Sequence, residues 1–553
     1  MRNNKINVDG LSSDDEVAAE FAKYFEGICS VKESDYVINS RNNYLNLYTK
    51  NEVFSICEPK YQVSIEMVEE VILAAKSGKA AGIDGLMAEH LKFAHPILCS
   101  SLKKLFNLLL DTGFVPDAFG LGLVFPIPKN SNASCCFLKI TDFRGITISP
   151  VISKIFEHCL IKIFDSALLS SHFQFGFKKG KGCRDALFVI NETIEFMTDN
   201  LSTVNICFVD LSKAFDNINH YVLFKKLLNK RVPICLIKLL VNWYTKCFCF
   251  VKWGSSISRI FLVSQGVRQG GVLSPILFSL YVDDALVRLN ETDLGCNLCG
   301  LFINAIMYAD DIILMSPSIK SLQNLVNLCE LEFRDINLGF NVSKCASLRI
   351  GARHKVGVPG LLDLQGASIH WVAEYKYLGI VVKSGLNFKV NVHQNKVKFF
   401  RTFNALFAKL GSINNPDTLI HLVKSNCLSI LLYNIEAVHL SRTNINELSY
   451  PLDRAYVKVF HVQERSSISW CQFYMNQLPV ELLIDSKRFW YLLKLENTQC
   501  PLMSHVFGIS SIKYIETLWK KYEIIGFSVE THKLSKAAMM KNIWKKFDTL
   551  LSA

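Results

Sequence analysis

The chain has 553 residues, of which 50% are hydrophobic and 20% are charged. At about 150 residues per domain this length excludes a single small module, and the hydrophobic content excludes a disordered chain. Lys and Arg (61) exceed Asp and Glu (49) by 12, a basic excess that suits a polyanionic partner without identifying it.

The spacing of apolar residues changes along the chain. From about residue 61 to 110 they recur at intervals of three and four, which is typical of helices. Between 121 and 383 short strand-like runs alternate with helical segments, and from about 388 helical patterns dominate. This order predicts an α/β or α+β fold.

Two features predict where the protein acts. No uncharged run reaches the roughly 18 apolar residues of a membrane span. The first 20 residues lack the apolar stretch of a signal peptide. We therefore expect an intracellular protein of the nucleus or cytoplasm, with no membrane partner.

A first candidate carboxylate follows an apolar run. Residues 204–209 have the pattern of a mostly buried strand, and Asp210 comes where it stops. An acid there is either functional or a turn former. Asp216 precedes the amphipathic segment 218–230, and we expect it to be the N-cap of that helix.

A second acidic site is Tyr308-Ala309-Asp310-Asp311, which separates two apolar, β-prone runs. This pattern predicts a hairpin with carboxylates at its tip. Acids beside buried strands are costly unless cations compensate them. Together with Asp210, the pair would offer the hard oxygen ligands that Mg²⁺ prefers, and two such ions about 3.5–4 Å apart promote nucleotidyl transfer. Mn²⁺ could replace Mg²⁺.

The string Tyr281-Val282-Asp283-Asp284 has the same pattern of one aromatic residue and two acids. Here Ser274-Pro275 begins a segment with helical apolar spacing, and Pro is common in the first turn of a helix. We therefore expect Asp283 and Asp284 to lie within or near the end of a helix as surface acids.

From about residue 76 to 383 the chain resembles the reverse transcriptase of a non-LTR (LINE-type, jockey-like) retrotransposon, because several motifs occur in that family's order. In chain order they are KAAGIDGLMAEHLK, PIPK, DFRGITISPVISKIFE, QFGFKKGKGCRDAL, FVDLSKAFDNINH, GVRQGGVLSPILFSLY, YADD, NVSKC and YKYLGIVV. Four residues depart from the usual motifs: Ile83, Gly145, Arg268 and Gly271.

The resemblance implies an α+β right-hand polymerase with fingers, a palm with an antiparallel sheet, a helical thumb and a helical C-terminal region. The expected parts are an N-terminal extension (1–60), the helical start of the fingers (61–109), the fingers and palm (110–383), the thumb (384–465) and the C-terminal region (466–553). The implied activity is RNA-directed DNA polymerisation from a primer 3′-hydroxyl, as part of retrotransposition.

The resemblance also assigns roles to residues. The catalytic, metal-binding acids would be Asp210, Asp310 and Asp311. The residues that bind the incoming dNTP would be Lys129, Arg144, Phe215, Gln269, Gly270 and Lys344. The primer and template would meet Tyr377, Leu378, Gly379, Lys178, Lys179 and Lys181. Each also has an ordinary structural reading, such as a core side chain for Phe215 and a plain β-turn for residues 377–379.

The implied partners are an RNA template, a DNA primer or target, and dNTPs. About 75 residues precede the fingers, and the tail shows no Cys-His cluster, so we expect an endonuclease to be supplied elsewhere. Two other hypotheses remain. One is a catalytically silent RNA-binding or assembly protein on the same scaffold. The other is an RNA-dependent RNA polymerase, which the bulky Phe215 opposes.

Overall fold

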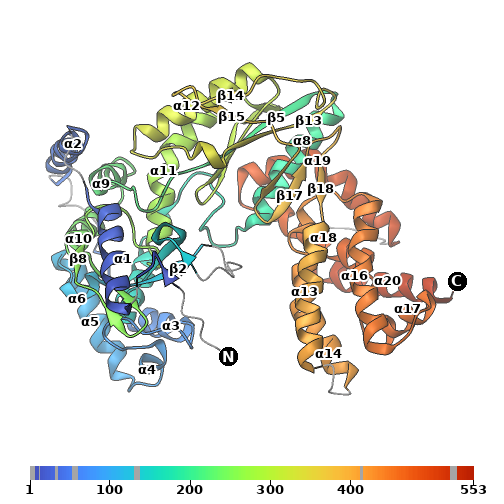
Figure 1. Cartoon of the computed structure of the whole chain (residues 1–553), viewed down its shortest axis with the longest axis horizontal. Coiled ribbons are helices and arrows are strands. Elements are labelled where there is room, and N and C mark those ends of the chain that lie inside the picture. The colour runs from blue at the N-terminus through green and yellow to red at the C-terminus, as the bar shows by residue number, and fades with distance from the viewer. Residues whose placement is uncertain are drawn as a thin grey trace. The chain divides into compact units, whose positions relative to one another are not determined.

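The computed structural model describes residues 7–11, 13–31, 35–52, 60–129, 137–410, 415–523 and 532–552. The chain forms two compact units (Figure 1). Unit 1 comprises residues 1–171, 211–285 and 331–339. Unit 2 comprises residues 172–210, 286–330 and 340–553.

Unit 1 combines a mixed sheet with helices. Its helices are α1 (Asp14–Cys29), α2 (Asp35–Glu52), α3 (Ile65–Ala74), α4 (Ala88–Lys92), α5 (Ile97–Thr112), α6 (Asp117–Gly120), α7 (Val151–Ile163), α9 (His220–Asn229), α10 (Ile234–Tyr244) and residues 274–285 of α11 (Ser274–Asn290). Its main strands are β2 (Leu121–Pro128), β4 (Phe143–Ile148), β6 (Phe248–Trp253), β7 (Ser256–Ile257) and β8 (Phe261–Leu262). Strand β2 is antiparallel to β4 and parallel to β6. A further parallel pair joins β1 (Asn7–Val8) to β3 (Phe137–Leu138).

Helix α1 packs on this sheet, although the sequence suggested only an extension there. It begins with a capping box in which Ser13 and Glu16 satisfy each other's backbone N–H groups. Phe21 is fully buried and lies 5.0 Å from the Phe143 ring and 5.3 Å from the Trp253 ring. Aromatic contacts of this kind contribute about 0.5–1.5 kcal/mol beyond the buried area, so α1 is part of the unit 1 core.

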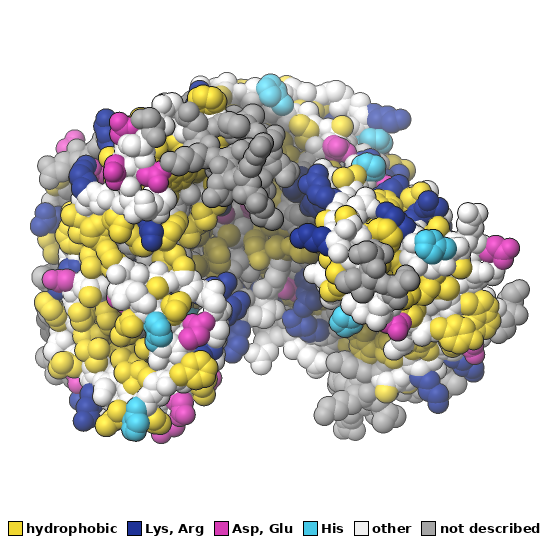
Figure 2. Space-filling view, turned by 60° about the horizontal axis from the view of Figure 1, so that its bottom comes forward, with side chains coloured by type: hydrophobic (Ala, Val, Ile, Leu, Met, Phe, Trp, Pro, Cys, Tyr) yellow, Lys and Arg dark blue, Asp and Glu magenta, His cyan; other side chains and the backbone are white. Residues whose placement is uncertain are grey.

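Exposed apolar side chains gather at the end of unit 1 that carries α3, α4 and α5. Figure 2 turns this end forward and shows many hydrophobic side chains on it. Leu73, Phe93, Ile97 and Leu108 are each more than half exposed.

Unit 2 is built on a four-stranded antiparallel sheet in the order β11-β12-β5-β13. Its strands are β5 (Thr203–Asp210), β11 (Ala305–Tyr308), β12 (Asp311–Ser316) and β13 (Ala346–Gly351). Helix α8 (Cys183–Asp199) packs against this sheet. The remaining strands of unit 2 are β9 (Cys296–Leu298), β10 (Leu301–Ile303), β14 (Leu361–Leu362), β15 (Ser368–Ile369), β16 (Glu374–Tyr377), β17 (Ile380–Lys383) and β18 (Lys389–Asn391).

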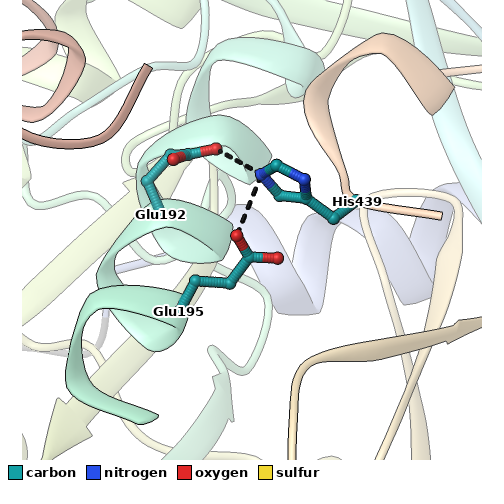
Figure 3. A group of neighbouring side chains, drawn as sticks. All are labelled: Glu192, Glu195 and His439. Carbon is teal, nitrogen blue, oxygen red and sulfur yellow. Dashed lines mark hydrogen bonds and ion pairs between the residues drawn. The ribbon is translucent and has the colours of Figure 1, made fainter. Parts of the chain in front are cut away.

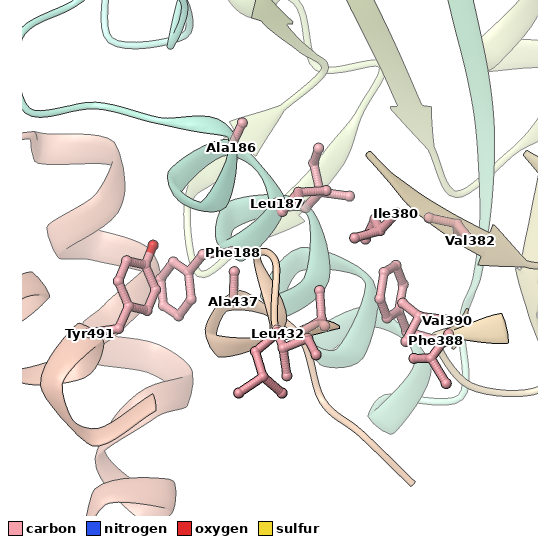
Figure 4. Packing of buried hydrophobic residues seen from close by; sticks show 14 of the residues in the cluster. Ala186, Leu187, Phe188, Ile380, Val382, Phe388, Val390, Leu432, Ala437 and Tyr491 are labelled. Carbon is pink, nitrogen blue, oxygen red and sulfur yellow. The ribbon is translucent and has the colours of Figure 1, made fainter. Parts of the chain in front are cut away.

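Helix α8 lies at the centre of the unit 2 core. Figure 4 shows Leu187 facing Ile380 and Phe388 of the β16–β18 region, while Phe188 faces Tyr491. The Phe188 and Tyr491 rings meet edge to face at 5.7 Å. This packing explains why every residue of α8 from Asp185 to Ile194 is buried, which is expected of a helix enclosed by other elements.

The rest of unit 2 is helical, as the sequence predicts from about residue 388. Its helices are α12 (Ile319–Arg334, residues 319–330 in this unit), α13 (His393–Leu410), α14 (Pro416–Leu422), α15 (Leu428–Leu431), α16 (Arg442–Phe460), α17 (Arg465–Tyr474), α18 (Val480–Glu496), α19 (Pro501–Lys521) and α20 (His532–Ser552). Mixed helices and antiparallel sheets confirm the α+β class. Among the helices described, none is both long enough and apolar enough to cross a bilayer.

Candidate active site

Asp210 lies at the carboxyl end of the central strand of the unit 2 sheet. Strand β5 has β12 on one side and β13 on the other, and every residue from Thr203 to Val209 is buried. Burial on both faces explains the nearly continuous apolar run. Asp210 is the first half-exposed residue of the strand, so the fold brings its carboxylate to the edge of the core.

The predicted hairpin carries the other two acids. Strands β11 and β12 pair from Ala305↔Leu314 to Tyr308↔Asp311, which leaves Ala309 and Asp310 as a two-residue turn. Only the first of these has a positive φ, 58°, as in the type II′ turns that suit the twist of a hairpin.

The register brings the three acids together. Asp311 lies directly opposite Asp210 in neighbouring antiparallel strands, where Cα atoms are about 4.5–5.5 Å apart, and Asp310 precedes Asp311 in the turn. The sequence analysis predicted this convergence from residues 100 positions apart.

The three carboxylates repel one another. Loss of solvation raises the pKa of Asp311 to about 6, and the negative charges of Asp310 and Asp210 contribute to the increase. Lys344 opposes it, with its Nζ 3.4 Å from Asp210 Oδ2. One lysine against three acids leaves the cluster with net negative charge, which favours binding of cations.

The donor set fits divalent magnesium, because all three groups supply hard oxygen ligands. Their oxygens do not all lie within 4.8 Å of one another, a spacing that among the described residues is met by Glu192, Glu195 and His439. Ligands of two ions about 3.5–4 Å apart can be separated by roughly 8 Å. The three acids therefore do not form a closed cage around one ion in this arrangement.

The β16–β17 hairpin packs against strand β5, which carries Asp210. The Tyr375 ring stacks on Phe208 of β5 at 4.3 Å, and the Tyr377 ring lies 5.3 Å from Phe208. Leu378 and Gly379 form the turn with positive φ values of 44° and 85°, the signature of a type I′ turn. Tyr377 is buried. Of the predicted primer residues 377–379, only the turn residues Leu378 and Gly379 are therefore accessible to a nucleic acid.

The predicted basic loop follows in unit 2 before α8. Lys179 is exposed, and Lys178 and Lys181 are half-buried. The Lys181 Nζ lies 2.6 Å from the Met503 sulfur, and Lys494 donates a hydrogen bond to the Gly180 carbonyl (3.2 Å). The C-terminal helices α18 and α19 therefore hold part of this loop.

Four of the predicted dNTP residues of unit 1 lie just after β2, on β4 and in the loop before α11. Lys129 follows β2 and donates to the Thr141 carbonyl (2.6 Å), while Arg144 is an exposed residue of β4. Gln269 Nε2 donates to Asp216 Oδ1 (2.9 Å). A Cβ on Gly270 would lie 2.3 Å from the Thr147 carbonyl oxygen, so this position requires glycine.

Phe215 packs against the core, in agreement with its ordinary structural reading. Its ring stacks on Phe278 of α11 at 4.6 Å with an interplanar angle of 16°. Phe278 is fully buried, whereas Phe215 is half-exposed. The inner face of Phe215 therefore belongs to the core, and the rest of its side chain is accessible to solvent.

The expectation that Asp216 caps a helix is wrong. Asn219 is the N-cap of α9, and its side chain accepts hydrogen bonds from Tyr221 and Val222. Asp216 lies earlier, where the chain turns back on Lys213. Burial raises the pKa of Asp216, and Gln269, Lys213, Arg144 and Lys129 lower it. Asp216 thus interacts with four side chains, of which Gln269, Arg144 and Lys129 are predicted dNTP residues.

The second pair of acids, residues 283–284, lies inside α11 as predicted, but these are not surface acids. Asp283 is buried and binds Lys230 (2.7 Å) and the Ser171 N–H (2.7 Å). Asp284 binds Lys226 (2.9 Å). Lysines near the end of α9 compensate both charges, and the periodicity of one helix could not reveal this pairing.

A third acidic cluster joins α8 to the chain that follows residue 437. His439 Nε2 lies 3.2 Å from Glu192 and 2.9 Å from Glu195 (Figure 3). Arg488 Nη2 lies 2.6 Å from His439 Nε2 and 3.8 Å from Glu192. Two carboxylates and one guanidinium leave a charge of −1, which a protonated imidazole neutralises and a divalent cation would overcompensate. This cluster is better explained as a proton-containing ion pair than as a metal site.

Gln174 is a residue of the site that the sequence analysis missed. It is buried, and its side chain hydrogen-bonds to both backbone groups of Ala309 in the turn between β11 and β12. The string QFGF that contains it was visible, but a polar residue outside a periodic run gives no signal of such a contact.

Comparisons with known proteins agree with this geometry. Residues 127–382 match the family described as "Reverse transcriptase (RNA-dependent DNA polymerase)". The chain is 24% identical over 442 residues to the RNA-directed DNA polymerase from mobile element jockey of Drosophila funebris, covering 77% of this chain and 46% of that protein. It is 28% identical over 308 residues to the Retrovirus-related Pol polyprotein from type-2 retrotransposable element R2DM of Drosophila melanogaster, covering 54% of this chain and 28% of that protein.

The chain therefore spans less than half the length of these two relatives. Among solved structures, apo telomerase from Candida tropicalis matches with a TM-score of 0.38 and 14% identity, over 81% of this chain and 74% of that chain. The family match covers both β5 and the hairpin that carries Asp310 and Asp311. Residues 127–382 thus match the reverse transcriptase family, and the chain is similar to polymerases of non-LTR retrotransposons.

Proposed function

We propose that this chain is an RNA-directed DNA polymerase that extends a primer 3′-hydroxyl on an RNA template during retrotransposition, with two Mg²⁺ ions in the catalytic step. The observation that carries this proposal is the pairing of Asp210 with Asp311, and the adjacent Asp310, inside the reverse transcriptase match. We expect the reaction to take place inside the cell, in the nucleus or cytoplasm, where the proposed RNA template and DNA target would be found. We expect the nick to come from an endonuclease supplied elsewhere.

The proposed roles of the residues are metal binding, proton donation and dNTP binding. Asp210, Asp310 and Asp311 would hold the ions, which when bound activate the primer hydroxyl and stabilise the leaving pyrophosphate. Lys344, 3.4 Å from Asp210, would donate a proton to the pyrophosphate. In unit 1, Lys129 and Arg144 would bind the triphosphate through charge-assisted hydrogen bonds, and Phe215 would exclude a 2′-hydroxyl.

The nucleic acid would meet other parts of the chain. The β16–β17 turn at Leu378–Gly379 would support the primer, and Lys178, Lys179 and Lys181 would neutralise template phosphates. Gln269 and Gly270 would lie beside the nascent base pair. We assign residues 61–383 to fingers and palm and residues 384–465 to the thumb.

Primer extension tests the proposal, with the purified chain, an RNA template, an annealed DNA primer, dNTPs and Mg²⁺. Asp310→Asn should lower the rate about 10³-fold, since metal ions supply several kcal/mol of transition-state stabilisation and each 1.4 kcal/mol is tenfold. Asp284→Asn, from the matching string in α11, is the control and should stay within a few-fold of the unmodified chain. Equal activity of the two variants would contradict the proposal.

Nucleotide selectivity separates the remaining hypotheses. The unmodified chain should incorporate dNTPs in preference to rNTPs, and Phe215→Ala should weaken this preference by about 10-fold or more, because the ring no longer blocks the 2′-hydroxyl. Tight RNA binding without any incorporation would support the silent scaffold. A preference for rNTPs would support an RNA-dependent RNA polymerase.

A further inference from the structure

The side chain of Gln174 holds the turn that carries Asp310. Gln174 is only 1% exposed and lies in unit 2. Its Oε1 accepts a hydrogen bond from the Ala309 N–H (3.1 Å), and its Nε2 donates to the Ala309 carbonyl oxygen (3.2 Å). One amide group thus binds both backbone groups of the residue that precedes Asp310.

The turn needs such support because Ala309 has a φ of +58°. Residues with a Cβ rarely adopt this left-handed region, whereas glycine does so without steric cost. Tyr308 and Asp311 pair on either side of the turn, but that pairing leaves the conformation of residues 309 and 310 to local contacts. The Gln174 amide supplies two of these contacts.

The backbone fixes Gln174 in place. Phe173 and Phe175 run beside β11 through the hydrogen bonds Met307 N–H to Phe173 carbonyl (3.0 Å) and Phe175 N–H to Met307 carbonyl (2.8 Å). The Gly176 N–H donates to Gln174 Oε1 (2.8 Å), and a Cβ on Gly176 would lie 2.3 Å from the Ala309 nitrogen. Two N–H donors on the oxygen and a carbonyl opposite the nitrogen also determine which way the amide points.

We propose that Gln174 is a positioning residue of the polymerase reaction, which keeps the Ala309–Asp310 turn in the single conformation that metal binding requires. The inference rests on the function proposed above. Gln174 acts through the backbone of the turn and contacts no reacting group. Metal-binding carboxylates must be held within about 0.5 Å, so a turn that samples several conformations would bind the ions in a poorer geometry.

Gln174→Met tests this role, because it removes all three hydrogen bonds of the amide, two with Ala309 and one with Gly176, at similar side-chain size. We expect kcat for primer extension to fall about 10- to 100-fold, the loss typical of small misplacement in an active site. The Kd for primer–template should not change. The increase in melting temperature on adding Mg²⁺ without nucleic acid should become smaller, which reports on the ion site independently of activity.

Gln472→Met is the matched control. Gln472 is also buried (2% exposed), and its Nε2 binds Asp453 (3.0 Å) between α17 and α16. Its replacement should lower the melting temperature but leave kcat and the Mg²⁺ effect unchanged. If both glutamine variants changed kcat and stability in the same proportion, Gln174 would be a structural residue and the inference would be wrong.

Rescue by glycine makes the test specific. Ala309→Gly relieves the positive-φ strain, so the double variant Gln174→Met/Ala309→Gly should recover several-fold in kcat over Gln174→Met alone. Gln174→Glu, which keeps an acceptor for the Ala309 N–H, serves if Gln174→Met does not fold, and should also lose activity. Unchanged kcat in the folded variant would overturn the inference. Absence of extension by the unmodified chain would instead contradict the proposed function.

Discussion

The pairs at residues 283–284 and 310–311 share a four-letter pattern but have opposite electrostatic surroundings. The first lies in α11 and is neutralised by Lys226 and Lys230. The second lies at a hairpin and faces Asp210, a further negative charge. The comparison teaches that the secondary structure around adjacent acids decides whether their charges are neutralised or accumulate, because the helix brings cations to its acids and the hairpin brings a further acid.

The strongest test of this comparison measures stability and activity in one variant from each site. Asp283→Asn leaves Lys230 without its buried partner and should cost about 3 kcal/mol, or roughly 6–12 °C in melting temperature, while activity below the transition persists. Asp210→Asn should abolish primer extension, by about 10³-fold or more, without lowering the melting temperature. Calorimetry and extension assays on both variants would show the opposite pattern if the roles were reversed.

The lysines of the two sites should differ in the same way. Lys344→Ala removes a candidate proton donor and should lower kcat about 10²-fold. Lys230→Ala removes the partner of Asp283 and should lower the melting temperature with kcat unchanged. Single-turnover rates and thermal unfolding measure the two effects, and a Lys344→Ala variant with normal kcat would exclude proton donation by this residue.

The pKa of Asp311, raised to about 6 from 3.8, predicts a stability difference in the absence of divalent ions. The folded chain binds more protons than the unfolded chain between these values, so the free energy of unfolding falls as the pH rises from about 4 to 6. With a chelator at pH 7.5, Asp311→Asn should therefore melt higher than the unmodified chain, and the difference should vanish near pH 4. If the melting temperatures of the two proteins differed by the same amount over this pH range, the raised pKa of Asp311 would be contradicted.

Replacing His439 should have the smallest effect on stability, and this variant should melt lower than the unmodified chain, whereas Asp311→Asn melts higher. Burial lowers the pKa of His439, but hydrogen bonds with Glu192 and Glu195 outweigh it and raise the pKa above its ordinary value. This stabilisation is complete below pH about 6.5 and is lost as the pH rises through the folded pKa. His439→Gln should melt on the order of 2 °C lower at pH 6 and equal to the unmodified chain at pH 9, as measured by calorimetry.

The sequence was sufficient for features that depend on local periodicity. The buried strand before Asp210, the hairpin at residues 308–311 and the helix around residues 281–284 each have a regular apolar pattern, and all three occur in the structure. The α+β class follows from the order of such segments. Convergence of the three acids could be anticipated because carboxylates beside buried strands carry a large free-energy cost unless bound cations compensate their charge.

Features that depend on contacts between distant segments could not be predicted. Lys226 and Lys230 lie more than 50 residues before the acids that they neutralise, and Gln174 lies 135 residues before Ala309. The cap of α9 was misassigned because Asp216 and Asn219 are both good caps, and only the turn at Lys213 decides between them. In each case a polar side chain was visible, but its partner was not.

The central place of β5 in its sheet limits how this chain can change over evolutionary time. Inserting or deleting one residue within 203–209 would invert the facing of every later side chain in the strand, and neighbours on both sides leave no free margin to absorb the shift. Substitutions can accumulate along this segment, but length changes should be eliminated. In related sequences, an altered distance between Thr203 and Asp210 would therefore indicate a disrupted sheet even where all three acids are present.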